Sequence, residues 1–325
     1  MKPRGASVKS LKNTSKQKTT PIDTPAPLVV IGTVAIDSVE TPFGKRDRVF
    51  GGSASYFSYA ASFFNSVALV ANVGNDFPAE YRQILEERKI NLGHLETTPG
   101  KTFYWKGKYG LDLNSAQTLD TQLNVLKDFN PKVHFKQSPR YLFLANIDPQ
   151  LQISILDQLA QPRPDFVACD TMNFWIHTKK KELLHVLARV DCVVMNDGEA
   201  REFTGESNLV RAGQKIRELG PAHVVIKKGE HGVLLFSEHH FFALPAYPLE
   251  AVFDPTGAGD TFAGGMMGYL AASKSVKFEA LKRAIAYGSV VASFTVEDFG
   301  LDSLRRIKRK DIDERLELFR KISSF

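Results

Sequence analysis

Short apolar runs alternate with helix-like segments along most of this 325-residue chain, and this alternation restricts the fold more than any other feature. The runs are rich in Val, Ile, Leu and Phe and occupy residues 28–32, 67–74, 141–146, 166–170, 191–196, 223–229 and 233–236. Because uniformly apolar strands are buried on both faces, the pattern predicts a doubly wound α/β domain with a mostly parallel sheet and helices on both faces. Ligands of such sheets bind beyond the carboxyl ends of the strands.

Two segments, residues 39–50 and 101–112, depart from this alternation. Large apolar and polar side chains alternate in both segments, which is typical of strands with one exposed face. We expect the two segments to pair into a small β lid over the ends of the central strands, with Phe103 and Trp105 near Asp37. The edge of such a lid needs cover, so it is the candidate surface for a homodimer.

The formal net charge of +6 comes from the N-terminal segment. Six of the 42 Lys and Arg residues precede Asp23, the first acidic residue, and the remaining bases and acids are equal in number. A body without net charge has no general attraction to a polyanion, so we expect no nucleic-acid partner. Residues 1–26 are basic and poor in large apolar groups, which predicts a disordered tail before one domain at 27–325. An organelle transit peptide is the alternative for this tail.

Neither membrane insertion nor export is indicated by the sequence. No segment approaches the roughly 18 consecutive apolar residues that a membrane span requires, and the N-terminus has no apolar signal core. The two cysteines, Cys169 and Cys192, lie in apolar runs, where a free thiol behaves as a small hydrophobe. We therefore expect a cytoplasmic protein without a membrane partner.

The segment AVFDPTGAGDTFAGGMMGYLAA, residues 251–272, carries the most informative motif. We expect a strand that ends at Phe253, a glycine turn, and a helix that begins near Thr261. Backbone N–H groups at the start of that helix would form a hole for an anion, because the helix dipole favours negative charge there. Three residues would supply these groups: Gly257, Ala258 and Gly259.

Asp260 follows this predicted anion hole directly. Its carboxylate is placed to accept a proton from an attacking hydroxyl group, which is the work of a general base. The alternative is an aspartate that caps the helix N-terminus, and such caps are common. Geometry alone favours neither interpretation.

Two further motifs follow predicted strands. Asn196 and Glu199 have the spacing of a helix capping box, which is the simplest explanation for this pair in isolation. Lys228, Gly229 and Gly232 lie between two predicted strands. They form either a plain hairpin turn or a glycine loop that a nucleotide approaches closely.

The first predicted strand is also followed by polar residues and glycines. Asp37 comes after this strand, and Gly52 and Ser53 open the next helix. An acidic residue at this place could bind sugar hydroxyl groups, or it could simply begin a turn.

Taken together and in this order, these motifs resemble the ribokinase-like, PfkB-type family of carbohydrate and nucleoside kinases. The resemblance covers about residues 28–303 and is densest at DPTGAGDTF. It implies a ribokinase-like fold and transfer of the ATP γ-phosphoryl group to a hydroxymethyl group of a sugar. An adenosine-type nucleoside kinase is the alternative within the family, and a non-catalytic regulatory or binding protein with this fold is the alternative outside enzymes.

The resemblance also implies a role for each site residue. Asp260 matches the catalytic base, beside the anion hole of Gly257, Ala258 and Gly259. Asn196 and Glu199 match the pair that organises Mg²⁺ and phosphate, directly or through water. The remaining matches are the nucleotide loop at Lys228, Gly229 and Gly232, the substrate contacts at Asp37, Gly52 and Ser53, and a monovalent-cation loop, for K⁺, at Asp254 and Thr256.

Tyr56 departs from the ribokinase pattern, which has an asparagine that contacts the sugar at this place. The departure concerns the identity of the substrate and leaves the chemistry unchanged. Aromatic residues elsewhere, among them Phe103, Trp105 and Trp175, leave room for a nucleoside base, although packing explains each of them individually.

Overall fold

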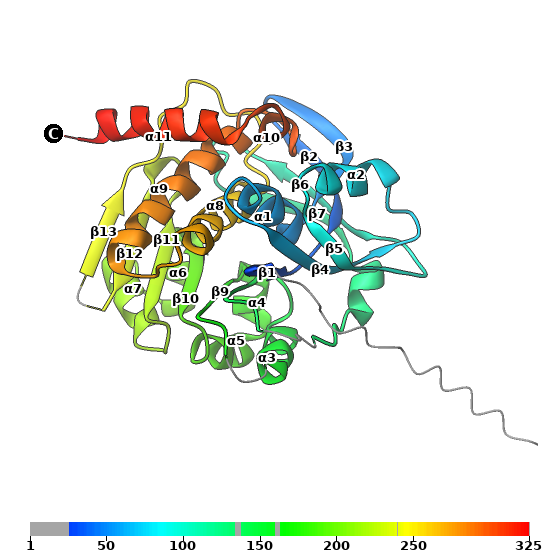
Figure 1. The fold of residues 1–325 in the computed structure, drawn as a ribbon, viewed down its shortest axis with the longest axis horizontal. Helices are drawn as coiled ribbons and strands as arrows, with labels where there is room; N and C mark the ends of the chain where they lie inside the picture. The colour runs from blue at the N-terminus through cyan, green and yellow to red at the C-terminus, as the bar shows by residue number, and fades with distance from the viewer. Residues whose placement is uncertain (1–25, 134–137, 160–162, 239, 325) are drawn as a thin grey trace, which may run out of the picture.

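The computed structural model describes residues 26–133, 138–159, 163–238 and 240–324, so nearly all of the predicted basic tail lies outside the described residues. A central sheet runs through the molecule (Figure 1). Its strands, in spatial order, are β13 (His240–Leu244), β12 (Val233–Ser237), β11 (His223–Lys227), β10 (Cys192–Asn196), β9 (Phe166–Asp170), β8 (Tyr141–Leu144), β1 (Leu28–Ile31), β4 (Val67–Gly74) and β5 (Asn91–Thr98).

The sheet is parallel from β5 to β11, and β12 and β13 add an antiparallel edge. Both of its faces are buried: Leu28 and Val30 of β1 belong to one hydrophobic core, whereas Val29 and Ile31 belong to the other. Side chains of a strand alternate between faces, so a strand that is apolar throughout has to be covered twice. The doubly wound α/β fold predicted from the sequence is therefore confirmed.

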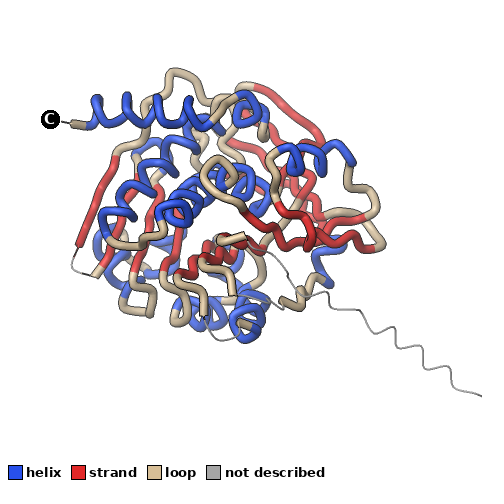
Figure 2. Tube along the Cα trace, in the orientation of Figure 1, coloured by secondary structure: helices blue, strands red, loops and turns tan. Residues whose placement is uncertain are grey.

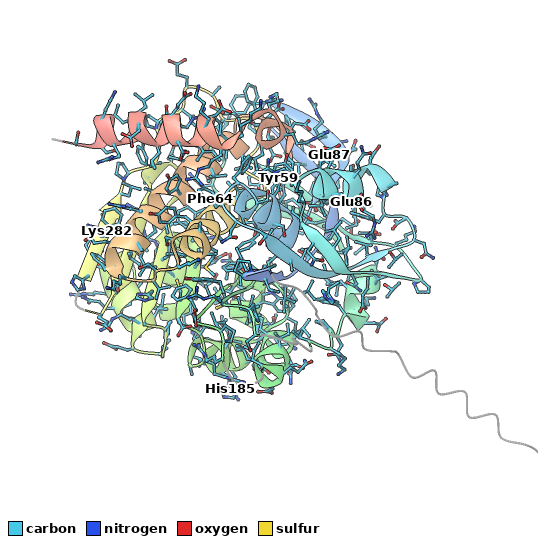
Figure 3. All side chains as sticks on the ribbon, in the orientation of Figure 1. Tyr59, Phe64, Glu86, Glu87, His185 and Lys282 are labelled. Atoms are coloured by element: carbon cyan, nitrogen blue, oxygen red, sulfur yellow. The ribbon has the colours of Figure 1, made fainter. Side chains whose placement is uncertain are left out.

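Helices cover each face of the sheet (Figure 2). The first core packs against α1 (Ser53–Ala61), α2 (Ala79–Glu87), α8 (Ala258–Ser273), α9 (Phe278–Thr295), α10 (Asp302–Arg306) and α11 (Arg309–Ser323). The second packs against α3 (Pro149–Gln158), α4 (Asn173–Thr178), α5 (Lys180–Leu187), α6 (Asp197–Thr204) and α7 (Leu209–Arg217). Phe64, labelled in Figure 3, follows α1 and packs edge-on against Tyr287 of α9, with ring centroids 5.1 Å apart. This contact helps to fix α1 against α9.

A second, four-stranded sheet projects beside the central one; we call it the lid sheet. Its strands are β3 (Gly44–Gly51), β2 (Ala35–Thr41), β6 (Phe103–Tyr109) and β7 (Ala116–Gln122). The two segments singled out in the sequence pair directly, because β2 runs parallel to β6 and Asp37 lies opposite Trp105. Strand β7 was not predicted, since its side chains are almost all exposed and carry no apolar alternation.

The segment before α8 differs from the sequence expectation. We expected a strand that ends at Phe253, but residues 251–255 form no strand. The N–H of Phe253 instead donates to the carbonyl of Val296 at the end of α9, at 2.8 Å, so this segment is held by a helix end and not by the sheet. Helix α8 also begins at Ala258, before the expected Thr261.

Within the described part of the chain, no helix is both long and apolar enough to cross a membrane.

Candidate active site

Helix α8 begins at a glycine that no other residue could replace without strain. Gly257 caps the helix with a φ of 75°. A Cβ added there would lie 2.5 Å from ring atoms of Tyr56, so the turn rests directly on this aromatic ring. The N–H of Ala258 donates to the carbonyl of Pro255 at 3.1 Å.

The other two amides of the predicted anion hole remain available. Among the described residues, the N–H groups of Gly257 and Gly259 donate no hydrogen bond. Both lie at the N-terminus of a 16-residue helix, where the dipole attracts negative charge. This end of α8 can therefore bind an anion through two backbone N–H groups.

Asp260 is the third residue of α8 and does not cap it, because Gly257 holds the N-cap position. The N-cap interpretation of Asp260 is therefore wrong. Burial raises the pKa of Asp260 to about 6, while the ammonium of Lys227 and the backbone N–H of Asp260 itself oppose the rise. A carboxylate with this pKa is mostly ionised at neutral pH and is a stronger proton acceptor than an ordinary aspartate.

Lys227, which was not among the predicted site residues, lies against this helix end. A Cβ added to Gly259 would be 2.5 Å from the Nζ atom of Lys227. Its neighbour Lys228 is the lysine predicted from the sequence; the backbone N–H of Lys228 donates to the carbonyl of Gly232 at 2.7 Å and closes the turn between β11 and β12. The spacing Lys-x-Gly-x-x-Gly, which ends at Gly229 and Gly232, could have identified Lys227.

Asn196 and Glu199 form the capping box of α6. The N–H of Asn196 donates to Oε2 of Glu199, and the N–H of Glu199 donates to Oδ1 of Asn196, both at 2.7 Å. Glu199 is buried, and burial raises its pKa to about 6, while Lys227 opposes the rise. The capping role is thus observed, and Oε1 of Glu199 is left without a hydrogen bond among the described residues.

Asp170, at the end of β9, completes this region. Its carboxylate is buried, and Oδ1 has no hydrogen-bond partner among the described residues. Burial, followed by the charge of Asp260, raises the pKa of Asp170, while the charge of Lys227 opposes this rise. Within the described residues, no group of three or more His, Cys, Asp or Glu side chains is arranged to hold a metal ion.

The turn between β11 and β12 requires glycine at two positions. Gly229 and Gly232 have φ of 53° and 91°. A Cβ at Gly229 would lie 2.1 Å from Oδ1 of Asn114, which belongs to the loop between β6 and β7. The lid sheet therefore approaches the predicted nucleotide loop through this asparagine.

Asp37 lies on β2 of the lid sheet and is buried. Its carboxylate accepts a hydrogen bond from the N–H of Gly52, and a Cβ at Gly51 would lie 1.9 Å from its Oδ2. Burial and the charge of Asp254 raise the pKa of Asp37 to about 8. The side chain of Ser53, also predicted as a substrate contact, is buried and shares a 3.0 Å hydrogen bond with Thr33.

Two tyrosines face the same region as Asp37. Tyr56 is only 1% exposed, and its hydroxyl has no hydrogen-bond partner among the described residues. Burial and the charges of Asp254, Asp37 and Asp260 raise the pKa of Tyr56. Burial and the same carboxylates raise the pKa of Tyr109, whose hydroxyl accepts a hydrogen bond from Thr256 at 3.3 Å.

Asp254 ties together the loop before α8. Its Oδ1 accepts the N–H of Thr256 at 2.9 Å, and its Oδ2 accepts the N–H of Gly300 at 3.3 Å. Burial raises the pKa of Asp254. The carboxylate of the predicted monovalent-cation loop thus already fixes that loop through backbone hydrogen bonds.

The charge of Asp260 interacts with predicted site residues and with residues that were not predicted from the sequence. We call Asp37, Tyr56, Tyr109 and Asp254 the acceptor side, and Asp170, Glu199 and Lys227 the nucleotide side. The charge of Asp260 raises the pKa of Asp37 in the first group and of Glu199 in the second. A buried carboxylate, a helix end that can bind an anion and polar groups around both are compatible with phosphoryl transfer.

The chain belongs to the pfkB family of carbohydrate kinases, whose sequence pattern matches residues 28–306. Among its relatives, a cytidine kinase of Thermococcus kodakarensis is 31% identical over 243 residues, which cover 74% of this chain and 87% of that protein. The protein is accordingly a kinase of this family, as the sequence motifs implied.

Solved structures share the fold. A ribokinase from Cryptococcus neoformans in complex with ADP superposes with a TM-score of 0.74 at 19% identity, covering 89% of this chain and 98% of that chain. A nucleoside kinase from Burkholderia thailandensis in complex with ADP-inosine gives a TM-score of 0.73 at 17% identity, covering 90% and 95%.

Proposed function

We propose that the protein transfers the γ-phosphoryl group of Mg-ATP to a hydroxymethyl group of a sugar, with Asp260 as the base. One observation carries this proposal: the charge of Asp260 acts on groups of both the acceptor side and the nucleotide side, and Asp260 lies in the first turn of a helix with two amides that donate no hydrogen bond among the described residues. Phosphoryl transfer requires these two substrates to meet in line at one base.

The proposed step follows from this arrangement. The acceptor oxygen attacks the γ-phosphorus, its bond to phosphorus forms as the bond to the bridging oxygen of ADP breaks, and its proton passes to the carboxylate of Asp260. The N–H groups of Gly257 and Gly259 donate to the oxygens of the transferred group, on which negative charge is spread. A base with a pKa of about 6 is ready to accept the proton at neutral pH.

The charges of the acceptor side favour a neutral acceptor. Asp37, Asp254 and Asp260 are close enough that their charges raise the pKa of Tyr56 and of Tyr109. A sugar phosphate placed beside the carboxylate of Asp260, which is mostly ionised at neutral pH, would be repelled. We therefore expect a free sugar or a nucleoside and not a phosphorylated sugar.

A nucleoside is the second candidate acceptor. The identity of 31% with a protein described as a cytidine kinase favours it, and Tyr56 stands where the ribokinase pattern has an asparagine. A nucleoside also presents a neutral sugar with a free hydroxymethyl group, so the base and the anion hole would act in the same way.

The nucleotide side fits Mg²⁺. Glu199 has one oxygen atom that makes no hydrogen bond within the described residues, and the buried Oδ1 of Asp170 also has none. Mg²⁺ is usually held by one or two carboxylates together with phosphate oxygens and water, so Glu199 and Asp170 would hold it beside the predicted Asn196. When bound, the ion would offset the negative charge of the phosphates.

We further propose that the lid sheet covers the acceptor. Three contacts support this role: Thr41 donates to the carbonyl of Phe253 at 2.9 Å, Tyr109 accepts from Thr256, and Asn114 lies against Gly229. Excluding water would protect ATP from wasteful hydrolysis. A homodimer through the edge of the lid sheet stays a prediction, which sedimentation would test.

The test is a screen for ADP release from Mg-ATP with pentoses, hexoses, hexose phosphates and nucleosides. The proposal expects turnover with a neutral sugar or nucleoside and a ³¹P signal of a phosphate monoester in the product. Turnover only with hexose phosphates would contradict the argument from charge, and no turnover with any hydroxymethyl compound would contradict the proposed reaction.

A further inference from the structure

Lys227 occupies an unusual position for a cation. It is the last residue of β11, and its Nζ atom lies where a side chain on Gly259 would begin, in the first turn of α8. The N-terminus of a helix carries partial positive charge and repels an ammonium group. Something other than the helix must therefore stabilise the amine at this place.

Three carboxyl groups supply that stabilisation at a distance. The charge of Lys227 opposes the rise that burial causes in the pKa of Asp170, Glu199 and Asp260. None of them forms an ion pair with the amine within 4.0 Å, and within the described residues the Lys227 side chain makes no hydrogen bond. A partly buried ammonium with three unused donors is ready to bind an anion.

We propose that Lys227 is a further catalytic residue, whose ammonium donates hydrogen bonds to the phosphoryl group as it leaves ATP and reaches the acceptor. This inference rests on the proposed function. The amine and the free N–H of Gly259 lie on the same helix end, so both can reach the same transferred group. During the step the P–O bond to ADP breaks, the P–O bond to the acceptor forms, and the acceptor proton goes to Asp260. Lys227 keeps its own protons and stabilises the charge on the phosphoryl oxygens.

A purely structural role for Lys227 predicts something different. An ammonium that only balances three carboxylates would affect ATP and ADP binding alike. A group that contacts the transferred phosphoryl group distinguishes the two nucleotides, because ADP lacks that group. The ratio of ATP to ADP affinity therefore separates the two roles without any turnover.

The first experiment measures the affinity of both nucleotides, without acceptor, for wild type, Lys227→Ala and Lys227→Arg. We expect Lys227→Ala to weaken the binding of ATP about tenfold or more and the binding of ADP less than twofold. The reason is that the hydrogen bond to a charged group is lost only in the ATP complex. We expect kcat to fall about 10²–10³-fold, with partial recovery in Lys227→Arg. Lys181→Ala, which removes an exposed lysine of α5, is the matched control for charge. An unchanged ATP to ADP ratio in Lys227→Ala would overturn the proposal.

A double-mutant cycle with Gly259→Ala tests the geometry. Apart from the chain neighbours and the helix backbone, the flexible end of Lys227 is the only group of the described residues within 4 Å of an added methyl, so the variant should fold and displace the amine. If both changes act by removing the ammonium, Lys227→Ala/Gly259→Ala loses no more kcat than Lys227→Ala alone. Multiplicative losses would place the effect of Gly259→Ala elsewhere and contradict this position for the amine.

The two proposals can fail separately. If the wild type phosphorylates no acceptor, the proposed function fails, but the nucleotide affinities still show whether Lys227 recognises the third phosphate. If turnover is found and the ATP to ADP ratio does not change in Lys227→Ala, only the role of Lys227 fails.

Discussion

The acceptor side and the nucleotide side present opposite electrostatic environments to Asp260. On the acceptor side burial and neighbouring carboxylates act together, and the pKa of Asp37 rises to about 8. On the nucleotide side Lys227 opposes the effect of burial, and the pKa of Glu199 rises only to about 6. Two buried carboxyl groups thus differ in protonation at neutral pH because one side contains a cation. A protonated carboxyl group and phenols suit the hydroxyls of a neutral sugar, whereas the ionised carboxylate of Glu199 and an ammonium suit Mg²⁺ and phosphate.

Removing the group that both sides share should have the largest effect. Asp260→Asn keeps the size of the side chain but removes the proton acceptor, and general-base assistance typically contributes about 10²–10⁴-fold. We expect kcat to fall at least about 10²-fold while ATP binding changes little, and the melting temperature should not fall, because asparagine replaces a buried carboxyl group whose pKa rises on folding. Steady-state kinetics and calorimetry on this variant check the prediction, and a kcat near that of the wild type would exclude Asp260 as the base.

Asp37→Asn tests the protonation of the acceptor side through stability. A carboxyl group whose pKa rises from 3.8 to about 8 on folding stabilises the fold fully below 3.8, and this stabilisation is lost as pH rises through 8. Asparagine does not ionise, so the melting temperature of Asp37→Asn should exceed that of the wild type by more at pH 8 than at pH 5. Glu199→Gln is the comparison from the nucleotide side. The difference in melting temperature between this variant and the wild type should change mostly below pH 6. The same difference at both pH values in Asp37→Asn would contradict the raised pKa of Asp37.

Tyr56→Phe tests whether the acceptor uses the unpaired phenol. The hydroxyl of Tyr56 has no partner among the described residues, so its removal should not lower the melting temperature. If this hydroxyl bonds the acceptor, KM for the acceptor should rise about threefold to tenfold with kcat largely retained. A lowered melting temperature with unchanged KM would show instead that the hydroxyl supports the fold.

The smallest effect concerns the predicted monovalent-cation loop. Asp254 and Thr256 precede the anion hole, so K⁺ bound there could fix the loop without contacting the acceptor. We expect turnover to rise when K⁺ replaces Na⁺. Since Asp254 already holds the loop through Thr256 and Gly300, the rise should be modest. Equal rates in the two salts would show that K⁺ does not contribute to turnover.

Much of the fold could be predicted because its signals are local. Continuous apolar runs such as 67–74 identify buried strands, whatever their position in the sheet. The turn before α8 has a left-handed backbone at Gly257, and a glycine in the sequence is the local signal for such a conformation. Strand β7 could not be predicted, since exposed strands carry no hydrophobic period. The strand expected at Phe253 was wrong because its partner, Val296, is a helix end distant in sequence.

The site could be predicted in part, for a similar reason. The motifs predicted that a lysine belongs to the site. They could not show which of two adjacent lysines reaches α8, because this depends on the direction in which the strand points each side chain. Lys227 pairs with Asn196 across β10 and β11 and reaches Gly259, whereas Lys228 lies in the turn. Burial, and then the charge of Asp254 more than 200 residues away in sequence, raises the pKa of Asp37, so no local pattern contains this shift.

The most direct test of Asp260 as the meeting point of the two sides is the pH dependence of kcat/KM for ATP, measured at saturating acceptor in the wild type and in Asp260→Asn. A base must be deprotonated to act, so the wild-type value should rise with pH with a slope of one and level off above an apparent pKa near 6. The residual activity of Asp260→Asn should lack this rise. If Asp260→Asn retains the same rise, another group is titrating, and the assignment of Asp260 as the base is contradicted.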